Sequence, residues 1–135
     1  MGAVEYHKGE NPVGEYLVQI ARPTSTGWVA GIPPLKATIT NRRLILVPQT
    51  RRPHPPASIP GLFILKINDL LLSHRQAVQI RLKNNYNLNL FVGWSQTNEF
   101  VHQLQNVITP SLRKGYTPAL SEGDLLRVIE EINRL

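Results

Sequence analysis

The chain has 135 residues, 41% of them hydrophobic, which is enough for one domain with its own core. Its net charge is +6 and 18% of its residues are charged, a balance that excludes intrinsic disorder. Without cysteine it has no disulfide, no thiolate metal site and no cysteine nucleophile. No apolar run approaches the roughly 20 residues of a membrane-spanning helix, and residues 1–15 lack a signal-peptide pattern, so we expect a cytoplasmic protein.

Positive charge is concentrated in the middle third of the sequence. Residues 37–83 contain eight bases and one acid, residues 1–36 are neutral overall, and residues 84–135 carry a net charge of −1. This concentration favours one basic face, suited to an anionic lipid surface, a nucleic acid or an acidic protein. The simpler alternative is a solvated strand surface that arginine and lysine keep soluble.

Two short strands are predicted in the first third of the chain. Residues 16–21 form an apolar run with β-branched members, and the turn-forming residues 22–27 end it. Residues 28–32 form a second apolar run. Pro33-Pro34 ends this run, because proline cannot donate a hydrogen bond to a neighbouring strand.

The clearest hairpin of the first half comes next. Apolar and polar residues alternate through residues 36–40, Asn41-Arg42 favours a tight turn, and residues 44–47 form a more deeply buried return strand. Residues 48–60 are rich in proline and arginine, a composition that excludes a helix and predicts an exposed loop. Loops of about a dozen residues are often functional or mobile.

Four further strand segments are predicted in the second half. Residues 62–67 and 70–72 are apolar and flank Asn68-Asp69, which we expect to form a turn or a bulge between two short strands. In residues 78–82 and 88–92 apolar side chains recur at every second position. This is the strongest periodic signal in the chain, and it predicts a hairpin.

The periodicity then changes from that of a strand to that of a helix. Ser95 is the predicted N-cap, and Phe100, Leu104 and Val107 lead an apolar stripe. Pro110 is expected to end this helix. Strands first and a helix last favour an antiparallel barrel or bent sheet with the helix over one opening.

A basic linker, residues 113–118, and a second helix follow. The helix is expected to begin at Ser121 with an acidic first turn, and Leu125, Ile129 and Ile132 form its apolar stripe. A helix of about 14 residues is marginal alone, so this stripe needs a cover. The cover is either the chain's own barrel or a second copy. In the second case the three residues are a self-association or partner surface.

The residues Ile39-Thr40-Asn41-Arg42-Arg43-Leu44-Ile45 resemble the hairpin that joins two barrel strands in GRAM and bacterial PH-like domains. Ser58-Ile59-Pro60 is similar to the segment that opens the next strand of that family, and residues 77–108 are similar to its closing strand pair and helix. The resemblance covers residues 15–108. It implies a mainly β fold, a PH-like antiparallel barrel of about seven strands capped by a C-terminal helix. This chain adds one extra terminal helix.

The resemblance also implies a division of the chain and the absence of a catalytic centre. Residues 1–110 are expected to form the PH-like domain, and residues 111–135 the linker and the terminal amphipathic helix. The sequence agrees, since its four histidines have no metal-ligand spacing and Asp69 is the only acid in residues 37–92. We therefore expect no enzyme activity, no cofactor and no metal.

Binding to lipid head groups is one function that the family implies. Phosphate oxygens need several converging lysines or arginines, but the first connection, residues 22–36, has a single base at each end. A specific phosphoinositide site is therefore not expected, and diffuse attraction to anionic membranes stays open as an alternative. The candidate surface for it comprises Arg42, Arg43, Arg51, Arg52 and Lys66.

Protein binding or self-association is the function that the sequence favours most. A PH-like barrel can accept an extended peptide along an open sheet edge, and the last helix offers a second surface. Non-specific nucleic-acid binding is a further alternative, because the pI is about 10.1. However, Phe63 is the only aromatic residue in residues 37–83, so a stacking platform for bases is not visible. The prediction is a non-catalytic interaction module with a protein partner or a homo-oligomer, and with peripheral membrane attachment as the alternative.

Overall fold

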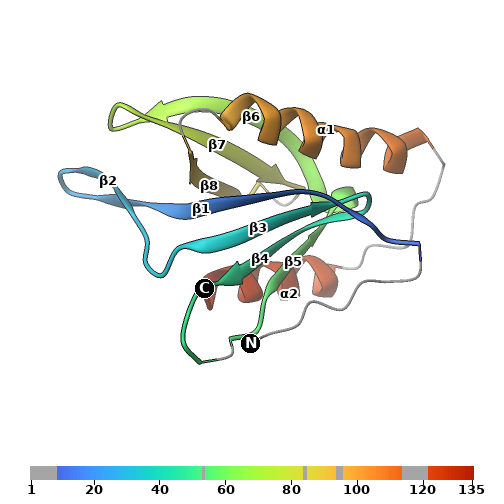
Figure 1. Ribbon diagram of the computed structural model, residues 1–135, viewed down its shortest axis with the longest axis horizontal. Helices are drawn as coiled ribbons and strands as arrows, with labels where there is room; N and C mark the ends of the chain where they lie inside the picture. Colours follow the sequence, from blue (N-terminus) through green and yellow to red (C-terminus); the bar gives the residue numbers. More distant parts are fainter. Residues whose placement is uncertain (1–8, 53, 84, 94–95, 114–121) are drawn as a thin grey trace.

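Strands form most of the molecule, and two helices lie on opposite sides of them (Figure 1). The computed structural model describes residues 9–52, 54–83, 85–93, 96–113 and 122–135. The strands in these ranges are β1 (Pro12–Thr24), β2 (Gly27–Ala30), β3 (Leu35–Thr40), β4 (Arg43–Pro48), β5 (Ala57–Pro60), β6 (Ile64–Leu72), β7 (Arg75–Leu82) and β8 (Asn87–Val92). A short 3-10 helix, η1 (Gly61–Phe63), precedes β6, and α1 (Thr97–Arg113) and α2 (Glu122–Asn133) follow β8.

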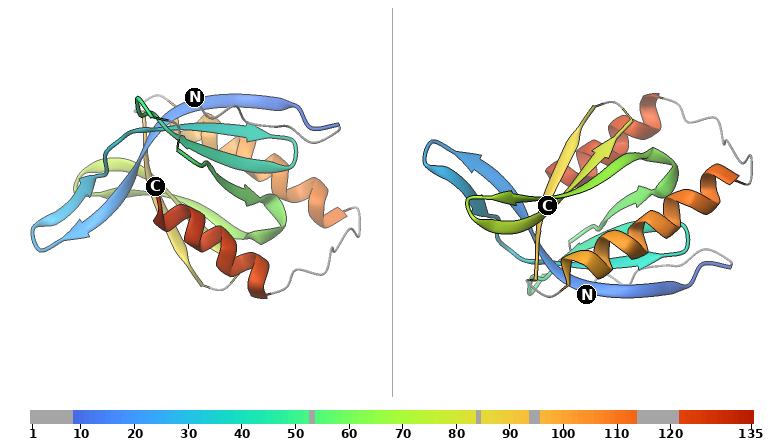
Figure 2. Two further views of the ribbon diagram at one scale, coloured as in Figure 1. Left: turned by 90° about the horizontal axis from the view of Figure 1, so that it is seen from below. Right: turned by 90° about the horizontal axis from the view of Figure 1, so that it is seen from above.

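All strand pairs are antiparallel, and the sheet order is β5-β4-β3-β1-β8-β7-β6. The long strand β1 joins the two halves of this sheet. Its residues 12–18 pair with β3, residues 18–20 pair with β8, and residues 21–24 pair with β2. The sheet bends around the core so that β5 and β6 become its two ends, as Figure 2 shows from below and from above. These observations confirm the mainly β prediction, with a C-terminal helix and one further helix.

The core lies inside the bent sheet and is closed by both helices. Every second residue of β3, β4, β7 and β8 points inward, as period-two alternation requires. Helix α1 contributes Phe100, Leu104 and Val107 to this core, the stripe that its sequence predicted. Close contact with α1 also explains Gly61, because a Cβ atom there would lie 2.9 Å from Cγ1 of Val107.

Tyr16 connects β1 to α1. Its ring meets that of Phe100 edge to face, with 5.2 Å between the ring centroids, and its hydroxyl donates a 2.6 Å hydrogen bond to Oε1 of Gln103. Burial, together with the nearby negative charge of Glu99, raises the pKa of the Tyr16 phenol from 10.0 to about 12.

Tyr16 is therefore expected to ionise near pH 12 rather than near pH 10. Because the folded-state pKa exceeds the unfolded one, its contribution to stability is present below pH 10 and is lost as pH rises towards 12. An ultraviolet titration of wild type and of Tyr16→Phe measures this directly. A difference spectrum that titrates near pH 10 would show that the phenol is hydrated instead.

One strand prediction was wrong. Asn68-Asp69 does not form a turn, because β6 runs unbroken from Ile64 to Leu72. Asn68 is only partly buried and Asp69 is exposed, so neither polar side chain opposes a strand. The turn lies at Ser73-His74, where both residues have positive φ, the two-residue geometry that suits the twist of a hairpin.

Two element boundaries also differ from the predictions. Strand β5 occupies the end of the predicted loop at residues 48–60. Helix α1 continues past Pro110 to Arg113. The carbonyl that Pro110 cannot bond belongs to Asn106, an exposed residue at which water can hydrate that group. The predicted cap Ser95 and the predicted helix start Ser121 lie outside the described residues.

Candidate interaction surface

The hairpin that resembles the GRAM signature is occupied by internal contacts. The side chain of Arg43 is 14% exposed, and that of Glu10 is fully buried beneath it. Arg43 donates from Nε to Oε2 of Glu10 at 2.8 Å and from Nη2 to Oε1 at 2.9 Å, a bidentate pair. Its Nη1 donates to Oγ of Ser58 on β5 at 2.9 Å. Arg43 thus stabilises the barrel and presents no open charge to a ligand.

The rest of the signature holds the same corner together. The Thr40 hydroxyl donates to Oε2 of Glu10 at 2.7 Å and accepts the backbone N–H groups of Arg42 and Arg43. Asn41 fixes the strand that arrives beside it, since its Nδ2 donates to the Gly9 carbonyl at 3.0 Å. Of the four signature residues, Asn41 and Arg42 are exposed, and the Asn41 side chain is engaged by the backbone of Gly9 and Asn11.

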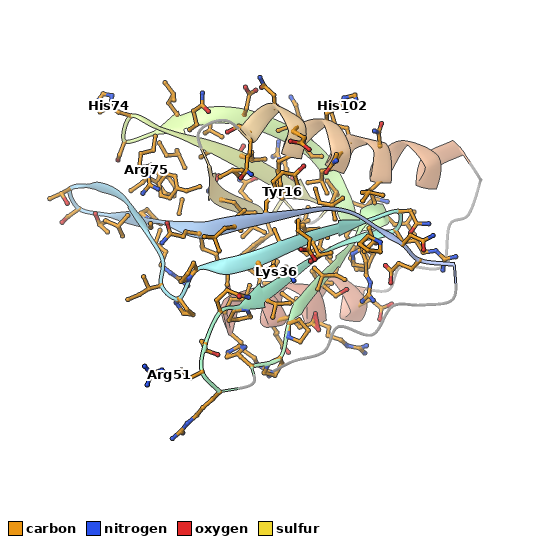
Figure 3. The ribbon with its side chains drawn as sticks, in the orientation of Figure 1. Tyr16, Lys36, Arg51, His74, Arg75 and His102 are labelled. Carbon is orange, nitrogen blue, oxygen red and sulfur yellow. The ribbon has the colours of Figure 1, made fainter. Side chains whose placement is uncertain are left out.

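The remaining predicted basic residues do not come together. Arg42 lies at the β3–β4 turn, whereas Arg51 and Arg52 lie in the loop at the other end of β4. Six residues of strand separate these ends by on the order of 17 Å. Figure 3 shows Arg51 at the loop tip, far from the hairpin tip that carries His74 and Arg75. Lys66 is exposed on β6, in the other half of the sheet.

Helix α2 packs on the chain's own barrel. Ile132 is only 2% exposed and, with Val128, belongs to the main core. Leu125 is partly buried against the same core, and Ile129 is half-buried. The sequence allowed either the chain's own barrel or a second copy to cover the apolar stripe of α2. In the structure the chain's own barrel covers it. Ile132 in particular lies in the core and not on a free partner surface.

The same helix covers one end of the sheet. Strand β5 is paired with β4 on one side only, and on the other side its Ser58 N–H donates to Oε1 of Glu131 at 3.1 Å. In the same last turn of α2, the Tyr86 hydroxyl donates to Oδ1 of Asn133 at 3.2 Å. The edge of β5 is consequently occupied by a helix.

The other end of the sheet, β6, contacts helix α1, but no further strand pairs with it among the described residues. Among the described residues β6 pairs only with β7. A two-residue turn makes Leu72 and Arg75 a hydrogen-bonded pair, and such pairs then recur at every second residue. The backbone N–H and C=O groups of Ile67, Asp69 and Leu71 therefore point away from β7. Within the described residues no hydrogen bond reaches them.

Apolar side chains lie exposed along this edge. Leu71 is 65% exposed and Leu65 is 56% exposed, although they flank a buried residue, Ile67. A bulge between Ile64 and Lys66 leaves Leu65 without a partner on β7. Exposed leucines beside unpaired backbone groups are the combination that a strand edge needs in order to bind another strand.

Contacts with β1 and β2 hold the turn end of the β6–β7 hairpin in place. A second, smaller apolar cluster on the outer sheet face joins Leu72, Ala77 and Phe91 to Ala21 of β1, with Trp28 packed against it. The backbone N–H of Trp28 also donates to Oγ of Ser73 in the β6–β7 turn at 2.8 Å. Contacts of this kind order the hairpin before any partner arrives, which lowers the entropy cost of binding.

Sequence reasoning missed this edge because it placed a turn at Asn68-Asp69. The length of the segment could have corrected this prediction. Residues 64–72, taken as one strand, have the length needed to pair with all of residues 75–82. In the described ranges, histidine and carboxylate side chains nowhere gather in groups of three that could hold a metal. No described helix has the length and apolar character needed to cross a membrane.

The fold is similar to that of one solved PH domain and of one further solved domain. Neither a family model nor a curated protein sequence matches this chain. A structure described as the Vps36 N-terminal PH domain superposes with a TM-score of 0.65 at 12% identity, covering 81% of this chain and 86% of that chain. The C-terminal domain of an unknown protein from Leishmania infantum gives a TM-score of 0.52 at 15% identity, over 75% of this chain and 87% of that chain.

The likeness to the first of these structures carries a coarse conclusion about what the chain is. It has a PH-like fold. The GRAM or bacterial PH subtype stays a prediction from the hairpin sequence.

Proposed function

We propose that this chain is a non-catalytic protein-interaction module that binds an extended segment of a partner along the edge of β6. The observation that carries the proposal is the row of outward backbone groups at Ile67, Asp69 and Leu71, beside the exposed side chain of Leu71. An added strand gains affinity from main-chain hydrogen bonds and selectivity from the side chains at alternate positions.

The two ends of the sheet differ, and this difference supports the choice of β6. Helix α2 already occupies the edge of β5 through Glu131. Natural proteins usually cover or disrupt an exposed edge strand, because it invites pairing with other chains. The nine-residue strand β6 has a bulge at one end and is otherwise uncovered by any backbone partner among the described residues.

The basic residues predicted for a membrane surface do not form one cluster. Anionic membranes attract clusters of bases on one face, at about 1 kcal/mol for each base near the surface. Here Arg42 and Arg51 lie at opposite ends of β4, and Arg43 is paired with buried Glu10. A flat bilayer would therefore meet only part of the predicted basic set at once.

Asp69→Pro is expected to abolish peptide binding while the fold is retained. Proline removes the outward N–H of residue 69 but no hydrogen bond to β7, and edge strands tolerate it. The measurement is selection of random linear peptides on the immobilised full chain, followed by titration of the enriched peptides against wild type and Asp69→Pro. Circular dichroism of the variant checks that it is folded.

Asp69→Ala is the matched control, since it removes the same side chain and keeps the backbone donor. Binding should survive in Asp69→Ala and be lost in Asp69→Pro. Equal binding by both variants would mean that the peptides attach elsewhere. Loss in both would assign the contact to the carboxylate and not to the strand edge.

A further inference from the structure

Four cationic side chains share the outer face of the β6–β7 hairpin. Lys66 lies directly opposite Arg81 in the register of the two strands, so their side chains are neighbours on one face. Arg75 and Lys83 fall on the same face as Arg81 because side chains alternate along a strand. All four are exposed.

None of the described acids lies on that face to compensate these charges. Asp69 is the only acid of β6, and its register partner Val78 belongs to the barrel core, so Asp69 lies on the opposite face. Within the described residues no carboxylate approaches any of the four bases within 4.0 Å, the two recorded ion pairs being Lys36 with Glu15 and Arg43 with Glu10. Like charges placed opposite each other on neighbouring strands are destabilising.

We infer that the segment which pairs with β6 is an acidic stretch of a partner protein, an inference that rests on the proposed strand addition. In an added strand, every second side chain lies on the outer face beside Lys66, Asn68 and Leu70. A carboxylate opposite Lys66 has its Cβ about 5 Å away, and Arg81 lies one strand further. The partner segment therefore carries acids on one face, near Lys66 and Arg81, and apolar residues near Leu71.

The same charges argue against a second copy of this chain as the occupant. Two β6 edges in contact would bring two outer faces with the same four bases into one continuous sheet. Repulsion between them would oppose pairing at low salt, whereas an acidic strand removes the repulsion that already exists within the hairpin.

The test uses three labelled peptides that differ only at every second residue, which is glutamate, glutamine or lysine, with valine and threonine between. Fluorescence anisotropy with the full chain at low salt should give about tenfold tighter binding of the glutamate peptide than of the glutamine peptide, as a few exposed ion pairs would supply. Raised salt should shrink this ratio. Lys66→Glu combined with Arg81→Glu should reverse it in favour of the lysine peptide.

Arg51→Glu combined with Arg52→Glu is the matched control, because it makes the same charge change in an exposed loop away from β6. It should leave the preference for glutamate unchanged, and an equal loss in this control would overturn the inference. If the glutamate and glutamine peptides bound equally well and Asp69→Pro abolished both, the inference of an acidic partner would be overturned, but strand addition would be retained. Glutamate binding that survives Asp69→Pro would overturn both. If light scattering showed a dimer that Asp69→Pro abolishes, the occupant of the β6 edge would be a second copy of this chain, and the acidic partner would be overturned.

Discussion

Replacing Arg43 with alanine is expected to lower the free energy of unfolding by about 3 kcal/mol, the scale for removing one partner of a buried ion pair. The substitution leaves the Glu10 carboxylate, which is fully buried, without its bidentate partner at 2.8 and 2.9 Å. It also removes the contact to Ser58, which ties β4 to β5. Urea unfolding of wild type and variant measures the difference.

Arg42→Ala is the control for this prediction, because it deletes the same chemical group one residue earlier, at an exposed position. Exposed substitutions of this kind change stability by roughly 0.5 kcal/mol or less. If the two variants were equally stable, the Glu10–Arg43 pair would be solvated in solution. If both were strongly destabilised, the turn itself and not the ion pair would be the cause.

Ile132→Ala in α2 should also cost about 3 kcal/mol, within the range for shortening a buried isoleucine. Ile132 is 2% exposed in the main core, so the substitution leaves a cavity between α2 and the barrel. The unfolding midpoint should not depend on protein concentration, since the cover of this stripe is the chain's own barrel.

Leu126→Ala provides the comparison on the same helix, because Leu126 is 58% exposed and faces away from the barrel. It should be nearly neutral. A midpoint that rises with protein concentration, together with a small effect of Ile132→Ala, would instead mean that α2 docks on a second copy in solution. That outcome would contradict the packing of α2 described above.

These two stability predictions separate structural from functional uses of the same residue types. Arg43 and Ile132 were both candidates for contacts with a ligand or partner. One is bonded to buried Glu10 and the other lies in the core, so substitution of either would weaken any binding indirectly, by unfolding the domain. Variants of β6, such as Asp69→Pro, are better probes of function because the positions concerned are exposed.

The sequence by itself determined the fold class and most of the elements. Period-two alternation located β3, β4, β7 and β8, and period-3.6 spacing identified the face of α1 that carries Phe100 and Leu104. These patterns are local, because each records the need of one element to bury one face. Such patterns can therefore be recognised in the sequence without knowing which element covers that face.

Only the tertiary structure decided which of these residues are available to a partner. The sequence cannot tell Arg42 from Arg43, yet one is exposed and the other meets Glu10 from more than 30 residues away. It also cannot tell that Glu131 of α2 bonds to the edge of β5 while the described part of the chain places no strand beyond β6, because strand order and helix docking depend on contacts between distant segments. The predicted basic set was therefore dispersed, and the free strand edge was found only once the sheet had been assembled.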